Sequence, residues 1–376
     1  MKKSLFLAAL AAMSLASCSS DDVIEVKQDA ITFEVVSDNA SRASIIYSAT
    51  NMPEKFKVYA VHTDASSNKT MYIDGVNVIK SGSSYVFEDG SVRYWPQDGS
   101  LTFYAIVQPQ GMYNPCDLAF DSDFNASLYT ENVYKNTGMG SKQFIQPNLD
   151  PSNHYDLIYA VQANKTKDMG VVVLNFRHAF AQVVFKAKNL SPKTLHVILK
   201  NIKINNVYRA GIFTLPSTST DSQVTTTNGI SLTNQGDWTN CIPNINDMAG
   251  SISDCVFATH AAGDYLNFEV NSTDVVALPN GNEFMMIPIE NNAYSVSNTT
   301  GTSLDITAEV YNIAGTEFNS ATDQLVSDGK NIPVSINWEQ GKKYIYTLLF
   351  GSDGQISFEL TVDDYISGTD TPVTVY

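Results

Sequence analysis

Residues 342–362 read KKYIYTLLFGSDGQISFELTV, and this stretch decides the fold class. In its second segment, from Ile356 to Val362, the apolar side chains fall on every other position. The Gly-Ser-Asp-Gly sequence at 351–354 supplies residues that tolerate the positive φ angles of a tight turn. One-sided alternation is typical of antiparallel strands that rest one face on a core and leave the other in water. The stretch therefore predicts a β-hairpin of a β-sandwich.

Short apolar runs of the same kind recur along the chain, separated by clusters of Gly, Asn, Asp, Ser and Pro. The 19 tyrosines and 18 phenylalanines also favour strands. No 12-residue stretch has a convincing 3.6-residue apolar period, so any helix should be short. The sequence thus predicts an all-β protein. The expected strands are 31–36, 56–61, 85–87, 101–107, 157–161, 180–187, 195–204, 284–289, 304–310, 344–350 and 356–362.

Length and local composition predict two domains. A chain of 376 residues is long for a single domain. We place the boundary in the polar stretch 164–170, which gives a first domain at 43–170 and a second at 171–376. Residues 108–154 read as a long irregular excursion, and such loops are usually functional or disordered.

The first residues carry an export signal. Residues 1–17 hold Lys2, Lys3 and an apolar run too short to span a bilayer, which is typical of a signal peptide. The Leu-Ala-Ser-Cys sequence ending at Cys18 resembles a bacterial lipobox, in which the cysteine is acylated and starts the mature chain. Ser19 after it resembles a signal for sorting to the outer membrane. The alternative is an ordinary signal with a chance cysteine; the lipobox implies a firm anchor of two or three acyl chains.

Charge and motifs exclude several classes of function. The formal net charge of −16 and the lack of a basic patch argue against phosphate-backbone binding, so we expect no nucleic-acid partner. The sequence has no Gly-x-Ser-x-Gly, His-Glu-x-x-His, Cys-x-x-Cys or phosphate-binding glycine motif. The five histidines are scattered, and His178 in FRHAFAQ is expected to be a satisfied core or interface residue. We therefore predict a protein that is not an enzyme and has no cofactor.

One stretch matches part of a calcium-binding loop. In DSDFNASLYTEN, Asp121, Asp123 and Asn125 occupy positions 1, 3 and 5 of such a loop. Ala126 and Asn132 replace the glycine and the final glutamate that the loop requires. A solvated loop is the better interpretation, and no metal site is expected.

Three cysteines follow Cys18 in the sequence. Cys241 and Cys255 are 14 positions apart, and a disulfide between them would stabilise the fold by about 3 kcal/mol. Export would permit such a bridge. Cys116 would then be left without a partner, and buried free thiols are common, so free cysteines remain the alternative.

Four stretches together resemble a fimbrillin, a lipoprotein pilin of the type V pili of Gram-negative anaerobes. Each is weak alone, but their order and spacing are fairly specific and extend over nearly the whole chain. They are the lipobox at Cys18, VRYWPQDGSLTFYAIV at 92–107, FRHAFAQVVFKAKN at 176–189, and GKKYIYTLLF with ISFELTVDDYISG at 341–368.

The resemblance implies a fold and a mode of assembly. The fold would be two tandem transthyretin-like antiparallel β-sandwich domains. The lipoprotein would reach the outer membrane and the cell surface, where an arginine-specific protease cuts after its first strand. The C-terminal strand of another pilin subunit would then fill the groove. The resulting fimbrium would contribute to adhesion to an unknown host or bacterial ligand.

The stretch AITFEVVSDNASRASI at 30–45 fits this scheme. It has an alternating apolar run followed by Arg42, which is the first arginine of the chain. We expect cleavage between Arg42 and Ala43, which would release segment 18–42 with its strand. The strand to be displaced would bury Ile31, Phe33 and Val35.

The expected donor strand is the C-terminal sequence TPVTVY at 371–376. Val373 and Val375 alternate with polar or larger residues, and Pro372 suits the start or edge of a strand. The strand is short, so the sequence leaves open whether the chain is a stalk subunit or an accessory subunit at the tip.

A surface glycan-binding outer-membrane lipoprotein is the alternative function. It would share the anchor and the β-sandwiches, and it would be marked by an exposed aromatic platform in residues 108–154. The aromatic side chains available for that platform are Tyr113, Phe120, Phe124, Tyr129 and Tyr134.

Overall fold

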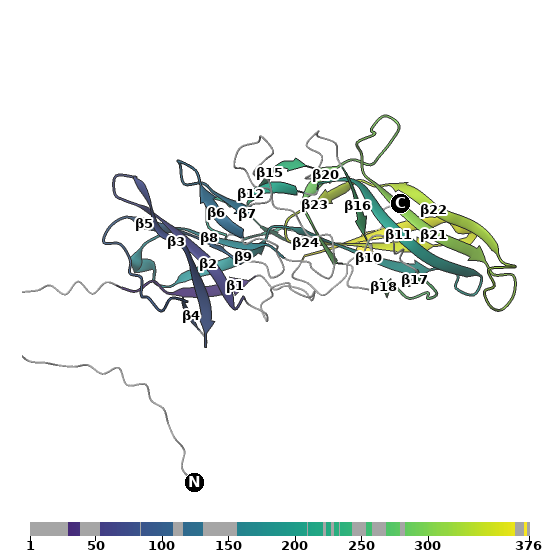
Figure 1. Cartoon of the computed structure of the whole chain (residues 1–376), viewed down its shortest axis with the longest axis horizontal. Helices are drawn as coiled ribbons and strands as arrows, with labels where there is room; N and C mark the ends of the chain where they lie inside the picture. Colours follow the sequence, from purple (N-terminus) through teal and green to yellow (C-terminus); the bar gives the residue numbers. More distant parts are fainter. Residues whose placement is uncertain are drawn as a thin grey trace, which may run out of the picture.

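The structure is a computed structural model, and it confirms the all-β prediction. Its described part has no α-helix and contains two short 3₁₀ turns, η2 (Lys167–Met169) and η3 (Ser352–Gly354). The molecule is elongated, with one β-structure at each end (Figure 1). The described residues are 29–37, 53–82, 84–107, 116–130, 156–208, 210–220, 223–226, 229–232, 234–242, 253–257, 268–278, 283–364 and 372–373.

A closed barrel forms one end of the molecule. Its strands are, in spatial order, β1 (Phe33–Ser37), β4 (Ser84–Phe87), β3 (Lys69–Ser81), β2 (Lys55–Thr63), β5 (Ser100–Ile106), β8 (Ile158–Lys165) and β9 (Val172–His178).

Strands β2, β5 and β8 are buried on both faces. In β5, Leu101, Phe103 and Ala105 belong to the core inside the barrel, while Tyr104 and Ile106 belong to a second apolar cluster outside it. Two-sided burial requires a nearly continuous apolar run rather than alternation. The run LTFYAIV at 101–107 meets that requirement.

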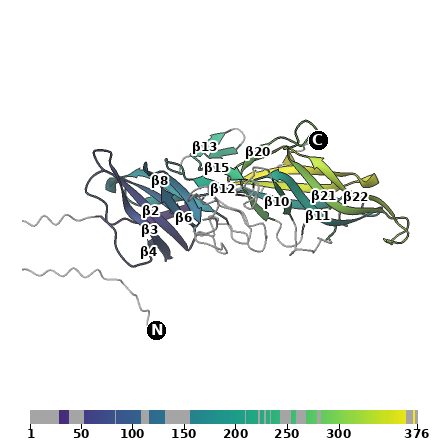
Figure 2. The same cartoon turned by 45° about the horizontal axis from the view of Figure 1, so that its top comes forward.

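A four-stranded sheet, which we call the cover sheet, packs over this outer face. Its members come from both halves of the sequence and meet where Ser127 pairs with Thr214. Figures 1 and 2 show β12 and β15 between the barrel and the second β-structure. The cover sheet consists of β15 (Asp237–Ile242), β12 (Ala210–Thr214), β7 (Ala126–Thr130) and β6 (Cys116–Phe120).

Two sheets enclose the core at the other end. Val183, Phe185, Tyr346 and Leu348 from the first sheet share one buried cluster with side chains such as Ile204 from the second. The first sheet has β18 (Val276–Ala277), β10 (Ala181–Asn189), β24 (Lys342–Phe350), β25 (Ile356–Asp364) and β26 (Pro372–Val373), with β19 (Glu283–Met286) also paired to β10. The second has β16 (Ser253–Phe257), β11 (Leu195–Val207), β21 (Ser303–Asn312) and β22 (Gln324–Pro333), with β17 (Phe268–Glu269) also paired to β11.

The hairpin predicted at 342–362 is confirmed. Strand β24 pairs antiparallel with β25 from Lys342↔Asp364 to Phe350↔Ile356, with η3 in the turn. Two further two-stranded sheets complete the described strands. They are β13 (Gln223–Thr226) with β14 (Gly229–Leu232), and β20 (Ile289–Asn291) with β23 (Ile336–Trp338).

The structure corrects two expectations. Strand β1 is parallel to β9, and β10 is parallel to β24, so the sheets are not purely antiparallel. Residues 108–154 contain the hairpin β6–β7 and are not wholly irregular. The domain boundary at 164–170 stays a prediction; in the structure β9 completes the barrel after it, and the next sheet begins at Ala181.

Candidate functional site

The candidate site is the position of β1, which lies between β4 and β9 and closes the barrel (Figure 1). Ile31, Phe33 and Val35 are buried, with exposed fractions of 4%, 5% and 9%, whereas Thr32 and Glu34 are exposed. The predicted alternation of apolar side chains along this strand is therefore confirmed. Removal of β1 would leave the hydrogen-bonding edges of β4 and β9 without their strand partner.

The two edges of β1 are held unequally. On one side β1 runs parallel to β9 over five register positions, from Phe33↔Val172 to Ser37↔Phe176. On the other side a single register pair, Phe33↔Tyr85, joins it to β4. The strand is thus anchored mainly along β9.

The segment before β1 is fixed by a short loop ladder. The Ile31 amide donates to the Arg93 carbonyl at 2.7 Å, and the Trp95 amide donates to the Asp29 carbonyl at 3.0 Å. The Trp95 indole packs edge-on against Phe103, with ring centroids 5.7 Å apart. These contacts bind residues 29–31 to the loop that precedes β5.

Phe33 is the central side chain of the site. Its ring makes edge-to-face contacts with Phe56, Phe87 and Phe103 at centroid distances of 6.2, 5.6 and 5.8 Å. Edge-to-face pairs place the positive ring edge against the negative face of a neighbour, which adds to simple area burial. Phe33 therefore fills a pocket formed by three aromatic rings of the barrel core.

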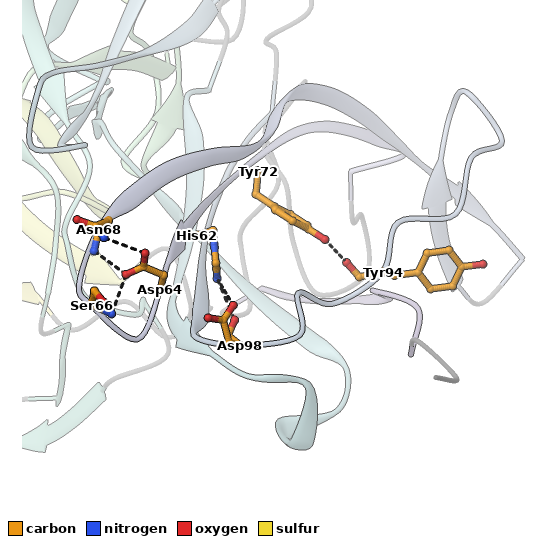
Figure 3. A network of polar contacts seen from close by, with 7 residues as sticks. All are labelled: His62, Asp64, Ser66, Asn68, Tyr72, Tyr94 and Asp98. Atoms are coloured by element: carbon orange, nitrogen blue, oxygen red, sulfur yellow. Dashed lines mark hydrogen bonds and ion pairs between the residues drawn. The ribbon is translucent and has the colours of Figure 1, made fainter. Parts of the chain in front are cut away.

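A polar network holds the loop at 91–99 against β2 and β3, as Figure 3 shows. The Tyr72 hydroxyl donates to the Tyr94 carbonyl at 2.7 Å, and a His62 ring nitrogen lies 2.9 Å from the Asp98 carbonyl. Gly99 ends the loop with φ +71°, and a Cβ there would collide with the Thr63 carbonyl. The loop that pairs with residues 29–31 is thus itself firmly placed.

Charge also stabilises this loop. The Arg93 guanidinium contacts the Asp89 carboxylate at 2.9 Å and lies 4.5 Å from the centroid of the Phe87 ring. Hydrogen bonds from Ser91, and then from Arg93, lower the pKa of Asp89 to about 2. The loop contacts β1 through its backbone and the aromatic pocket through Arg93.

The structure covers only part of the predicted exchange machinery. Residues 1–17 and the predicted lipidation residue Cys18 lie outside the described residues, as do the cleavage residues Arg42 and Ala43. The described chain stops at Ser37 and resumes at Pro53, so the predicted cleavage lies in the connection between β1 and β2.

The predicted donor strand, 371–376, has two residues with a described backbone position, Pro372 and Val373. Val373 pairs with Leu360, and Pro372 with Thr361, which puts β26 at the edge of its own sheet beside β25. Val375 is outside the described residues.

The stretch considered as a calcium loop is a hairpin turn between β6 and β7. The Asp121 carboxylate accepts the amides of Asp123 and Asn125 at 2.9 Å each and the Asn125 side-chain amide at 2.9 Å. These bonds lower the pKa of Asp121, and they engage both carboxylate oxygens in hydrogen bonds within the turn. No group of three or more potential metal ligands occurs within the residues that the structure describes.

The aromatic platform of the alternative function is not formed by its two described rings. Phe120 packs against Tyr59 and Tyr104 at centroid distances of 5.7 and 5.5 Å, and Phe124 lies against Phe120 at 6.4 Å. Both rings therefore belong to the cluster under the cover sheet. Of the others, Tyr113 and Tyr134 are outside the described residues, as is the side chain of Tyr129.

His178 is an interface residue, as predicted. Its Nδ1 lies 2.6 Å from the carboxylate of Asp156, which is fully buried at the junction of the barrel and the next sheet. This partner could not be predicted from the sequence, because Asp156 lies in a polar stretch with no periodicity.

The cysteine contacts do not support the predicted disulfide. Cys241 carries a free thiol, and burial raises the pKa of that thiol to about 11. The side chain of Cys255 is outside the described residues, so the bridge remains a prediction.

Among the described residues there is no helix with the length and apolar character of a membrane span.

Comparison with known proteins gives a family and a similar fold. A family model described as fimbrillin-like matches residues 41–364. A fimbrial protein from Bacteroides vulgatus has a similar structure, with a TM-score of 0.56, 14% identity, and coverage of 89% of this chain and 99% of that one. A fimbrial assembly protein from Parabacteroides distasonis is 9% identical, with a TM-score of 0.36, over 92% of this chain and 99% of its own. No curated protein sequence matches the chain.

Proposed function

Because this chain belongs to the fimbrillin-like family, we propose that it is a structural subunit of cell-surface fimbriae that assembles by strand exchange at the β1 position. The observation that carries the proposal is the place of β1. It is the strand that closes the barrel between β4 and β9, and together with Ile31 just before it, it fills the core with three alternate apolar side chains.

Proteolysis is the proposed trigger. While β1 remains covalently joined to β2, it competes for its groove at an effective concentration in the millimolar range, which a dilute strand from another subunit does not match. A cut between Arg42 and Ala43 removes that advantage. Two of the other three arginines are poor targets for an arginine-specific protease, because Arg177 is 2% exposed and Arg93 is held by Asp89 and Phe87. The third, Arg209, lies outside the described residues.

The vacated groove suits an incoming strand with the same alternation. Burial of three large apolar side chains contributes about 5–9 kcal/mol before the entropy of ordering is subtracted. Backbone hydrogen bonds to the exposed edges would add to this, as in other cases of strand addition. The proposed donor is the C-terminal end with Val373 and Val375. Its described residues, Pro372 and Val373, lie at the edge of their sheet, which supports release without opening a central ladder.

Export and attachment complete the proposal. Acylation at Cys18 would tether the precursor to the outer membrane, and two or three acyl chains would make that attachment firm. After the cut, residues 18–42 would stay with the membrane and the subunit would enter the fimbrium. The partners are other pilin subunits, with roles either in the stalk or at the tip, and the fimbrium would serve adhesion.

The test uses purified full-length precursor and an arginine-specific endoprotease. We expect one early cut, identified by N-terminal sequencing at Ala43, followed by SDS-resistant ladders. The matched control is Arg42→Lys, which keeps the charge but removes the recognition residue. Under the same protease it should stay monomeric, and brief treatment with trypsin, which also cuts after lysine, should restore the ladders.

A second variant separates cleavage from donation. Deletion of 372–376 should leave cleavage after Arg42 intact and abolish the ladders, because the groove opens but no donor strand is present. Ladders of equal yield from the Arg42→Lys protein under the arginine-specific protease would contradict the proposed trigger. Ladders of equal yield from the truncated protein would contradict the proposed donor.

A further inference from the structure

A polar cleft of about 380 Å³ lies on the outer face of the sheet that contains β11, β21 and β22. This size falls within the range of small-molecule sites in proteins. It is far from β1 in the fold, since it belongs to the opposite β-structure (Figure 1). Its lining residues are Lys203, Asn205, Asn206, Tyr294, Ser303 and Asn331.

The strand register builds the bed of the cleft. Ser303 pairs with Asn205 on β11, and Asp305 pairs with Asn331 on β22. Because side chains alternate along a strand, these four project away from Leu304, which is in the core. The sheet thus presents a continuous group of amide, hydroxyl and carboxylate groups on its outer face.

The bed is held together by its own hydrogen bonds. The side-chain amides of Asn205 and Asn331 both donate to the Ser303 hydroxyl, at 3.0 Å each. Both also donate to the Asp305 carboxylate, Asn205 at 2.9 Å. These bonds fix the positions of the polar groups before any ligand arrives, which reduces the entropy cost of binding.

One acceptor in the bed has no partner. Both hydrogens of the Asn205 side-chain amide are used by Ser303 and Asp305, which fixes the orientation of that amide. Its Oδ1 atom is buried and accepts no hydrogen bond. A buried acceptor without a donor is costly, so this bed of polar groups is maintained at an energetic expense in the fold.

An aromatic ring forms the rim. Tyr294 lines the cleft and remains 39% exposed. Its loop is tied down, because the Tyr294 amide donates to the Thr302 carbonyl at 2.9 Å and the Asn206 side-chain amide donates to the Gly301 carbonyl at 2.6 Å. Gly301 is required there, since a Cβ would collide with the Ala293 carbonyl. The ring is therefore presented by a braced loop beside a polar bed.

From these features we infer that the cleft binds a neutral sugar residue. A pyranose has apolar C–H faces, which stack on an aromatic ring, and hydroxyls that each donate and accept hydrogen bonds. Tyr294 offers the stacking surface, and the bed offers fixed amide and hydroxyl groups beside it. Lys203 and Asp305 have opposite formal charges, and the chain carries −16 overall, which disfavours an anionic ligand. The inference is independent of strand exchange at β1.

The test uses the full chain and four probes, the methyl glycosides of glucose, galactose, mannose and N-acetylglucosamine, in saturation-transfer difference NMR. At least one should bind at or below about 10 mM, and Tyr294→Ala should weaken that binding about ten-fold or more. Tyr294→Trp should retain it, because the stacking surface is kept. The matched control is Tyr94→Ala, which removes a ring that is 42% exposed on the other β-structure and should leave binding unchanged.

Two results would overturn the inference. One is the absence of detectable binding for all four glycosides up to about 10 mM, since a dissociation constant above that concentration corresponds to a binding free energy weaker than about 3 kcal/mol. The other is binding by Tyr294→Ala within about two-fold of the parent chain, with the near-UV spectrum showing that the variant is folded. Tyr294→Ala should still form ladders after cleavage at Arg42, so failure of this inference is separate from failure of the proposed function.

Discussion

Replacement of Phe33 by alanine tests whether β1 is an independently removable strand. Phe33 is 5% exposed and makes three edge-to-face ring contacts inside the barrel. Truncation of a buried phenylalanine costs about 3–5 kcal/mol, and the ring contacts place this position toward the upper end. The exposed neighbour Thr32 is the matched control, since Thr32→Ala leaves the core untouched.

Amide hydrogen exchange measures the effect where it is expected. The Val172 amide of β9 donates to the Thr32 carbonyl at 2.9 Å, so its protection reports the detachment of β1. A loss of 3–5 kcal/mol should lower that protection by about two to four orders of magnitude. Amides shared by β2 and β5 should lose much less, because detachment of β1 leaves their ladder in place.

Two outcomes would refute this reasoning. A loss of protection at Val172 smaller than about ten-fold would mean that Phe33 does not hold the strand. An equal loss across β2 and β5 would mean that the barrel opens only as a whole, and β1 would not be removable. In the Thr32→Ala control, protection at Val172 should change by less than about ten-fold, because an exposed strand substitution costs at most about 1 kcal/mol.

Two further predictions concern titration. The pKa of Asp89 is lowered to about 2 by hydrogen bonds from Ser91 and Arg93. The stabilisation of the folded chain by this carboxylate is therefore complete above its unfolded pKa of about 3.9 and is lost as pH falls through 2. A midpoint at or above 3.8 for the Asp89 carboxyl carbon in an NMR titration would contradict these contacts. Burial and nearby Asp237 raise the pKa of Cys241 to about 11, so at pH 8 iodoacetamide should alkylate it roughly 100-fold more slowly in the native chain than in the unfolded one. Similar rates in both states would refute that burial, whereas a requirement for prior reduction would support the predicted disulfide.

The strand closing the barrel could be predicted from sequence because its signal is local. Ile31, Phe33 and Val35 alternate with exposed Thr32 and Glu34, and a period of two fixes which side chains enter a core. The same reasoning identified the β24–β25 hairpin. Neither pattern specifies the neighbour of a strand, which is why the parallel pairing of β1 with β9 was not predicted.

The hairpin β6–β7 was missed although its turn has a readable signal. Asp64 and Asn68 in the β2–β3 turn make the same bonds as Asp121 and Asn125, with the aspartate accepting the amides two and four positions later (Figure 3). The residue before each asparagine has positive φ, 67° at Ser67 and 61° at Phe124. An aspartate followed four positions later by asparagine is thus a turn signal that resembles half of a calcium loop.

The polar cleft had no signal in the sequence. Asn205, Ser303 and Asn331 are separated by about 100 and 28 positions, and each alone reads as an ordinary outward strand residue. Only the register of β11, β21 and β22 brings them together. Sites made by cross-strand juxtaposition depend on long-range pairing, which alternation does not encode.

The mixed origin of the cover sheet has a consequence for biosynthesis. Tyr59, Tyr104 and Tyr159 on the outside of the barrel pack under strands that extend as far as Ile242. As the polypeptide emerges from the ribosome or a secretion pore, β6 and β7 can cover Tyr59 and Tyr104 early, but the β12 and β15 half of the cover sheet, which includes the Phe213 partner of Tyr159, is complete only after nearly two thirds of the chain. The nascent first half is therefore a client for holding chaperones, and a fragment ending near residue 170 should be prone to aggregate.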